Sequence, residues 1–293
     1  MSDQEWDLDA LDLAAYLDRV AYTGPTDPSA ATLAGLHRAH VAAIPFENFD
    51  VILGRGVSVD LTDIQSKLVR GRRGGYCYEH GLLFAAVLQR LGYGVERLLA
   101  RVGPDLTRPR PRTHMVLSVT ADDGARWLAD VGFGSGLLEP ILLHPHAPVT
   151  QGAWTYQLVH PDAGADAQLW LLQEQVKGAE WTTQYSLGEE RQHLADVVMA
   201  NHYTSTWPRS PFVAQPVLVR KDERQIRSLL GRKLTHSRPG APDAVLHLDD
   251  RDYAAAVHDL GIDLDRADTD ALIAHLPPAK PRDSPPVAEA KQR

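Results

Sequence analysis

The side chain with the clearest chemical potential in this sequence is Cys77, the only cysteine among 293 residues. It follows the glycine pair Gly74 and Gly75 and begins a stretch of helical periodicity that ends around Leu91. The N-terminus of a helix carries partial positive charge and unpaired N–H groups, which favour a thiolate over a thiol. This setting is typical of a cysteine nucleophile, although a lone cysteine can also serve as a small buried apolar side chain.

A thiolate nucleophile needs a base, usually a histidine, and the histidine needs an orienting acid or amide. Among the 13 histidines, His114 opens a strand-like segment whose alternate residues form an apolar face, and it lies on the other face. Asp130 ends the next strand-like segment, just before a Gly-Phe-Gly sequence. We therefore expect a triad of Cys77, His114 and Asp130, with a turn-forming role for Asp130 as the alternative.

Other histidines fit less specific roles. His37 and His40 lie on an expected helix, as core or solvated residues. His144 and His146 have metal-ligating side chains, but no further cluster of ligand residues stands near them in the sequence. We therefore predict no metal site.

The strands that carry His114 and Asp130 allow a geometric test. Directly opposed residues of an antiparallel hairpin share a face, so the two side chains meet only across an odd-numbered or bulged connection. A three-residue connection sets His114 opposite Asp130, whereas a five-residue connection, 121–125, sets Val116 opposite it and leaves His114 on the diagonal. In either case we expect the Asp130 carboxylate to accept a hydrogen bond from Nδ1 of His114.

The periodicity of the chain indicates which elements position these residues. Helical spacing over 8–20, 32–41 and 82–91 predicts a helical domain, 1–91, with helix starts near 28–29 and 61–63. Short alternating segments separated by Gly, Pro and Asp predict an antiparallel β-barrel domain, 92–200. Its strands are expected at 95–102, 114–120, 126–131, 154–159 and 169–172, and a helix at 189–201 follows them.

The remainder reads as a third, mixed α/β domain, 201–276, with strands at 216–219 and 229–234 and helices at 251–260 and 268–276. The last 17 residues, 277–293, include five prolines and predict a flexible tail.

Composition narrows the class of protein. The 44% hydrophobic content is that of a globular protein, and a net charge of −8 argues against nucleic acid or an anionic membrane as a main partner. A single cysteine excludes internal disulfides, and neither a signal peptide nor a membrane-spanning run is recognisable. We expect a cytoplasmic protein.

Taken together, the motifs resemble those of the arylamine N-acetyltransferases. The resemblance covers roughly residues 35–215 and rests on Ile-Pro-Phe-Glu-Asn at 44–48, Arg-Gly-Gly-Tyr-Cys-Tyr-Glu at 73–79, Thr-His at 113–114, Asp-Val-Gly-Phe-Gly at 130–134 and Ser-Thr-Trp-Pro at 205–208. It implies an α+β fold with a helical N-terminal domain, an antiparallel β-barrel and an α/β lid, built around a cysteine-protease-like Cys-His-Asp core.

The resemblance also implies binding residues. Thr113, Gly132, Gly134, Thr206 and Trp207 correspond to contacts with the cosubstrate acetyl-CoA, and Phe46, Tyr78 and Phe133 to the walls of an aryl acceptor pocket. Each aromatic residue could equally belong to the core. The segment 216–238, with seven basic against two acidic residues, could meet phosphates or form a solvated surface. The sequence departs from the family pattern at His80 and Gly81, behind the nucleophile.

The activity implied is acetyl-CoA-dependent N-acetylation of aromatic amines and hydrazines by a ping-pong mechanism through acetyl-Cys77. An amide synthase of the same family, acting on a polyketide thioester, would keep the same triad. A Cys-His-Asp thioester or amide hydrolase would use water in place of the amine. A non-catalytic module that binds aryl ligands or CoA is disfavoured because all three triad residues are present.

Overall fold

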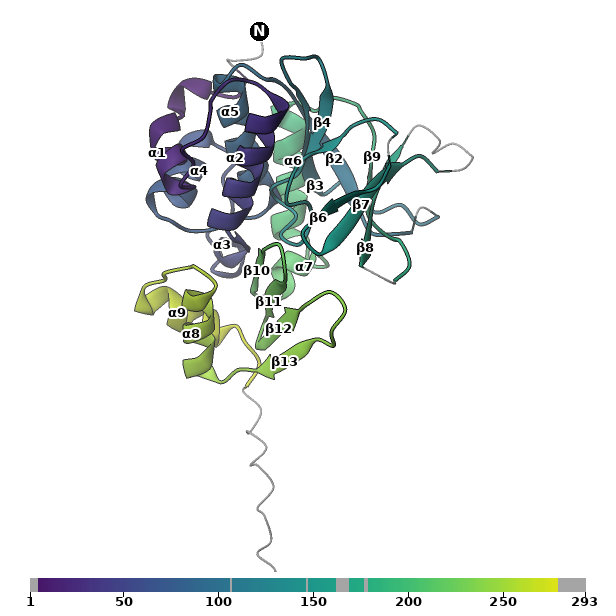
Figure 1. The fold of residues 1–293 in the computed structure, drawn as a ribbon. Helices are drawn as coiled ribbons and strands as arrows, with labels where there is room; N and C mark the ends of the chain where they lie inside the picture. Colours follow the sequence, from purple (N-terminus) through teal and green to yellow (C-terminus); the bar gives the residue numbers. More distant parts are fainter. Residues whose placement is uncertain (1–4, 106, 146, 162–168, 177–178, 279–293) are drawn as a thin grey trace, which may run out of the picture.

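The computed structural model describes residues 5–105, 107–145, 147–161, 169–176 and 179–278. A helical part lies beside a curled sheet, and a smaller part with its own sheet and two helices adjoins both (Figure 1). The helices of the first part are α1 (Leu13–Arg19), α2 (Ala30–Ala43), α3 (Phe49–Ile52), α4 (Leu61–Gln65), which continues into a π-helical turn (Ser66–Arg70), and α5 (Cys77–Arg90), after a short 3-10 helix (Leu8–Ala10).

Side-chain caps explain where several of these helices begin. The side chains of Asp12, Ser29 and Asp60 each accept a hydrogen bond from a backbone N–H of the helix that follows, which satisfies a donor without an intrahelical partner. The expected starts near residues 28–29 and 61–63 are confirmed. Helix α5 is buried on nearly every side because apolar residues surround its axis, and it packs against strands β2 and β3.

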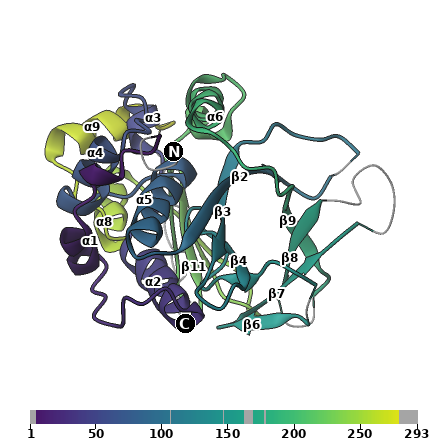
Figure 2. The same cartoon turned by 90° about the horizontal axis from the view of Figure 1, so that it is seen from above.

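The second part is an antiparallel eight-stranded sheet that curls into a nearly closed barrel (Figure 2). Its strands follow the order β5-β4-β3-β2-β9-β8-β7-β6. Their bounds are β2 (Gly94–Val102), β3 (His114–Thr120), β4 (Arg126–Ala129), β5 (Ile141–Leu142), β6 (Val149–Gln151), β7 (Trp154–Val159), β8 (Trp170–Val176) and β9 (Thr182–Leu187). The predicted barrel is confirmed, and apolar side chains of these strands form its interior cluster.

The third part is a five-stranded antiparallel sheet of order β1-β10-β11-β12-β13, covered by two helices. Its elements are β1 (Phe46–Glu47), β10 (Val217–Lys221), β11 (Ile226–Leu230), β12 (Lys233–Ser237), β13 (Ala244–His247), α8 (Asp250–Asp259) and α9 (Arg266–Ala274). Helices α6 (Leu194–Thr206) and α7 (Pro211–Ala214) lead into it, and apolar residues of both pack on the core of the helical part. Edge strand β1 comes from the N-terminal segment, and α6 runs through residue 200. The domain boundaries at 91 and 200 stay a prediction: α6 extends across residue 200, and β1 belongs to this sheet although its residues lie within 1–91.

Three expectations about local structure need correction or lie outside the described residues. The strand expected at 229–234 is a hairpin, because Gly231 adopts a positive φ of 51° and Leu230 pairs with Lys233 across a two-residue turn. The helix expected at 189–201 begins at Leu194, where Asp196 accepts the His193 N–H, and ends just before Pro208. The tail lies outside the described residues apart from positions 277–278.

Candidate active site

Cys77 occupies the first position of α5 and is 2% exposed. The carboxylate of Glu79 accepts the N–H of Tyr76 at 3.0 Å, which caps the helix at the residue before the cysteine. The preceding loop lies close against the helical part, since a Cβ on Gly74 would stand 2.2 Å from the Pro45 carbonyl oxygen. The Cys77 sulfur lies 3.7 Å from the carbonyl oxygen of Thr113, the residue before His114.

Buried ion pairs hold the loop that precedes Cys77 in place. Lys67 donates to Glu79 at 2.8 Å and lies 2.7 Å from Asp50, while Arg73 donates to the fully buried Glu47 at 2.8 Å. Charged side chains taken out of water need such partners. The network joins the loop before Cys77 to the segment that carries β1.

The strands β3 and β4 bring His114 and Asp130 together. Thr120 pairs with Arg126 and Leu117 with Ala129, so the connection has five residues, 121–125, with Gly124 at a φ of 79°. This register confirms the odd connection and leaves His114 diagonal to Asp130. Both side chains are almost completely buried.

The atom that links the pair differs from our expectation. Nε2 of His114, not Nδ1, donates to the Asp130 carboxylate at 2.8 Å. Nε2 lies farther from the backbone than Nδ1 and therefore reaches the diagonal position. Nδ1 is left for the Cys77 sulfur, which also interacts with this ring.

The pair has complementary electrostatics. Burial opposes protonation of His114, but the Asp130 carboxylate and then Cys77 outweigh it, so that the pKa of His114 is raised. Burial also opposes ionisation of Asp130, yet His114 and the Gly132 N–H hold its pKa below the usual range. The arrangement favours an imidazolium next to the Cys77 sulfur.

The loop after Asp130 lies directly against Cys77. The Gly132 N–H donates to Asp130 at 3.1 Å, and a Cβ on Gly132 would stand 2.8 Å from the Cys77 Cα. Only glycine allows this approach. The Phe133 ring contacts the His114 ring edge-on, with centroids 5.0 Å apart.

The other residues expected to bind ligands differ in their burial and in their neighbours. Phe46 is buried and lies against Gly134, whose added Cβ would come within 3.0 Å of it. Tyr78 is fully buried, with its hydroxyl 3.2 Å from Thr204 on α6, so the structure packs it as a core residue. Thr206 and Trp207 lie at the exposed end of α6, where Trp207 stacks on Tyr203.

His37 was expected to be a core or solvated helix residue, and it is a buried residue with a specific role. Its Nδ1 donates to the Leu138 carbonyl at 2.9 Å, and its Nε2 accepts the backbone N–H of Asp130 at 3.1 Å. His37 therefore bridges both ends of the loop that begins at Asp130. The helical spacing of Leu33, Leu36 and His37 could have indicated its inward orientation.

The departure from the family pattern at His80 and Gly81 has a structural explanation. Nε2 of His80 lies 3.0 Å from the Gly75 carbonyl oxygen and must donate, so its Nδ1 accepts from Nε2 of His40 at 2.9 Å. Nδ1 of His40 then accepts from the Tyr16 hydroxyl at 3.0 Å. Gly81 leaves room for Met115, whose sulfur would stand 3.2 Å from an added Cβ.

Because these histidines are buried, we expect the free energy of unfolding to depend on pH in acid. The variant H37Q isolates the contribution of His37. Burial lowers the pKa of His37 and of His80 to about 4, against 6.5 in the unfolded chain. Between these values the unfolded state binds more protons, so each histidine makes the free energy of unfolding fall as pH falls. Burial raises the pKa of Glu79 to about 7, which acts in the opposite direction.

The variant H37Q should separate these effects, since glutamine can donate to Leu138 and accept from Asp130 without titrating. Urea unfolding between about pH 6.5 and pH 5 should show a pH slope that differs from wild type by up to about 1.4 kcal/mol per pH unit, with H37Q less acid-sensitive. Identical slopes would show that His37 does not remain neutral in the folded protein.

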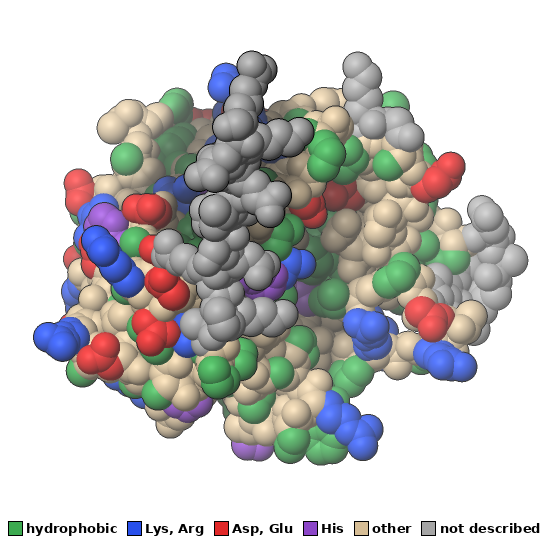
Figure 3. Space-filling view, turned by 90° about the horizontal axis from the view of Figure 1, so that it is seen from below, with side chains coloured by type: hydrophobic (Ala, Val, Ile, Leu, Met, Phe, Trp, Pro, Cys, Tyr) green, Lys and Arg blue, Asp and Glu red, His purple; other side chains and the backbone are tan. Residues whose placement is uncertain are grey.

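Several of the seven basic side chains in the segment 216–238 bind groups within the protein. Arg220 donates to the carbonyls of Ala42 and Leu260, Arg232 to those of Leu248 and Pro277, and Lys221 is buried. Acidic and basic side chains are interspersed over the face seen from below (Figure 3). Arg224, Lys233 and Arg238 of this segment are exposed, so a role of the segment in binding phosphates stays a prediction.

Two kinds of feature are absent from the described parts of the chain. These parts contain no group of three or more His, Cys, Asp or Glu residues arranged to hold a metal ion. No helix among them has the length and apolarity needed to cross a membrane.

Comparison with known proteins places this geometry in a family. The N-acetyltransferase family model matches residues 29–269. The arylamine N-acetyltransferase of Mycobacterium tuberculosis is 38% identical over 260 residues, which cover 85% of this chain and 87% of that protein. The crystal structure of the Nocardia farcinica arylamine N-acetyltransferase is 39% identical and has a TM-score of 0.86, covering 92% of this chain and 95% of that one.

A third relative was solved with a ligand. The arylamine N-acetyltransferase of Mycobacterium marinum in complex with CoA is 32% identical and has a TM-score of 0.78, covering 90% of this chain and 98% of that one. From the matched family model, the sequence identities and the shared fold, we conclude that this chain belongs to the arylamine N-acetyltransferase family.

Proposed function

We propose that this protein transfers the acetyl group of acetyl-CoA to aromatic amines and hydrazines, with Cys77 as the acylated nucleophile. The observation that carries the proposal is the 2.8 Å bond between His114 and Asp130, formed beside a cysteine at the start of a helix. The names of the relatives support the acceptor class, and the relative solved with CoA supports the donor.

The first half of the reaction acylates the enzyme. The Cys77 thiolate forms a bond to the thioester carbonyl carbon, and the bond from that carbon to the CoA sulfur breaks. His114 gives its Nδ1 proton to the departing sulfur and becomes neutral. Helix N-terminal amides, including that of Cys77, are suited to stabilise the negative charge that develops on the carbonyl oxygen.

The second half regenerates the enzyme. The amine nitrogen bonds to the acetyl carbon, His114 accepts the amine proton at Nδ1, and Cys77 leaves as a thiolate. Asp130 keeps the Nε2 proton in place in both halves, so that Nδ1 alone exchanges protons. Phe133, whose ring contacts His114, and Phe46, which lies against Gly134, are the proposed walls for an aryl ring. Gly132, Gly134, Thr113, Thr206 and Trp207 remain the proposed contacts for CoA.

Intact mass and steady-state kinetics test this proposal together. Incubation with acetyl-CoA alone should add one acetyl group to Cys77, and a later addition of aniline should remove it. Double-reciprocal plots against acetyl-CoA at several aniline concentrations should be parallel. Intersecting lines without an acetylated enzyme would contradict the covalent mechanism, and rapid loss of the acetyl group to water would indicate a hydrolase.

A further inference from the structure

The loop that follows Asp130 has no regular secondary structure up to Leu137, so no neighbouring strand supplies partners for its backbone. It nevertheless carries Gly132 against Cys77 and Phe133 against His114. His37 of α2 holds its two ends. The middle of the loop must be held by another group.

That group is the side chain of Lys221 at the end of β10. Its ammonium nitrogen donates to the carbonyl oxygens of Ser135 at 2.9 Å and Gly136 at 2.7 Å. It also donates to the Tyr156 hydroxyl, and the Glu174 carboxylate lies 3.5 Å away. The three N–H donors of the lysine thus have three close oxygen acceptors, two of them on the loop.

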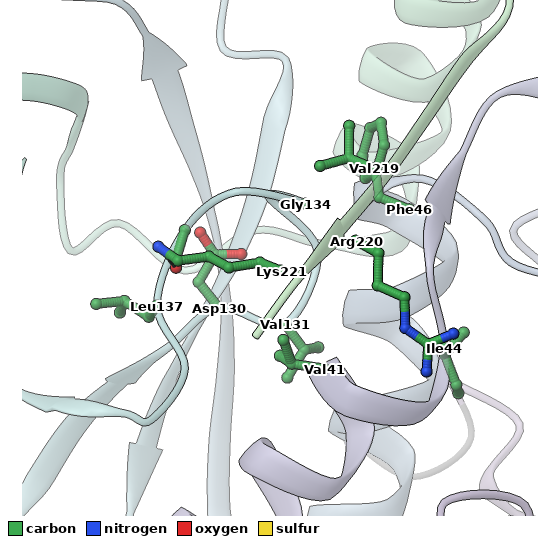
Figure 4. A pocket seen from close by; sticks show the side chains of 11 residues that line it. Val41, Ile44, Phe46, Asp130, Val131, Gly134, Leu137, Val219, Arg220 and Lys221 are labelled. Carbon is green, nitrogen blue, oxygen red and sulfur yellow. Dashed lines mark hydrogen bonds between the residues drawn. The ribbon is translucent and has the colours of Figure 1, made fainter. Parts of the chain in front are cut away.

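Lys221 belongs to the five-stranded sheet, whereas the loop that it contacts follows strand β4 of the barrel. Arg220 and Lys221 leave β10 in opposite directions, and the Lys221 side chain extends to the side of Asp130 and Leu137 (Figure 4). The cavity lined by Asp130, Leu137 and Lys221, among others, has a volume of about 10 Å³, which is enough for about one water molecule. Loop and strand are therefore tightly packed, and the lysine joins the third part of the protein to the barrel.

Burial of the Lys221 ammonium group costs free energy unless hydrogen bonds and a charged partner replace its lost hydration. The Lys221 side chain is only 1% exposed, and burial lowers its pKa to about 8 while Glu174 opposes that change. The Trp154 ring lies under the ammonium, 4.0 Å from its centroid. An apolar side chain would avoid this desolvation but would leave the carbonyl of Ser135 without its lysine donor.

We propose that Lys221 is a positioning residue for the acceptor side of the site: its ammonium group fixes the backbone at 135–136 and thereby the Phe133 ring beside His114. The inference rests on the proposed function in one respect, the assignment of Phe133 to the acceptor pocket. Asp130 has its own supports in His37, His114 and the Gly132 N–H. Loss of Lys221 should therefore disturb acceptor binding more than acylation of Cys77.

The variant K221M tests this, with K233M as a matched control because Lys233 is exposed on the same sheet. Backbone amides of residues 132–138, followed by hydrogen–deuterium exchange, should exchange at least about tenfold faster in K221M and unchanged in K233M. With enzyme acetylated beforehand, the aniline concentration for half-maximal discharge should rise about tenfold, while acetylation by acetyl-CoA changes less than about threefold.

Unchanged exchange in K221M would overturn the proposal, as would equal slowing of both half-reactions, which indicates a general loss of structure. Should K221M not fold, Y156F removes a donor to Gly136 and an acceptor of Lys221, and should shift aniline discharge about threefold in the same direction. If acetyl-CoA never acetylates the wild-type enzyme, the proposed function fails, and the exchange measurement still decides the role of Lys221.

Discussion

Replacement of Cys77 by serine should lower kcat/KM for aniline acetylation by at least about 10⁴-fold, because a serine hydroxyl remains protonated where the thiol can ionise beside His114. The only sulfur nucleophile of the chain is removed, while the side chain keeps nearly the same size at a site that is 2% exposed. Initial rates and intact-mass spectra after incubation with acetyl-CoA measure the effect, and C77S should carry no acetyl group.

Two controls distinguish loss of the cysteine sulfur from a general loss of structure or of another nucleophile. Urea unfolding of C77S should remain within about 1 kcal/mol of wild type, since only a sulfur-to-oxygen exchange is made. The double variant C77S/H114A should be no slower than C77S by more than a few-fold, because residues that act as one unit are not additive. Additive losses, or an acetyl group found on a lysine or serine of the wild-type protein, would assign the nucleophile elsewhere.

Replacement of Asp130 by asparagine should lower kcat/KM by about 10³- to 10⁴-fold. Both carboxylate oxygens accept bonds, one from Nε2 of His114 at 2.8 Å and the other from the Gly132 N–H at 3.1 Å. An asparagine side chain has only one oxygen, so its amide group must face one of these donors. If it faces His114, the ring proton moves to Nδ1 and a neutral imidazole can no longer accept a proton from the amine there.

The variant D122N provides the matched control, because Asp122 is an exposed aspartate in the same β3–β4 connection. Its kcat/KM should stay within about twofold of wild type. The alkylation of Cys77 by iodoacetamide near pH 6 should be slower in D130N than in D122N, since loss of the carboxylate weakens the imidazolium that stabilises the thiolate. Equal rates of alkylation and catalysis in the two variants would remove Asp130 from the mechanism.

The residues that the sequence placed correctly are those governed by local rules. A glycine pair before an apolar helical run predicted the cysteine at a helix start, and strand alternation predicted that His114 and Asp130 can meet only across an odd or bulged connection. Both rules depend on neighbours within a few residues along the chain or across one hairpin. The hairpin at Gly231 is an exception, because the strand predicted over 229–234 is interrupted by a glycine whose positive φ marks a turn.

The groups that only the tertiary structure identified act across long distances in sequence. His37 binds the Asp130 N–H across 93 residues, and Lys221 binds the Gly136 carbonyl across 85. No local period signals such partners, because the buried carbonyls and N–H groups of an irregular loop take whatever donor or acceptor the packing of other elements brings to them. By itself the sequence determined that Cys77 begins a helix, and it predicted an odd connection on the condition that His114 and Asp130 meet. Packing decided which histidine nitrogen faces Asp130, and which buried side chains hold the loop beside it.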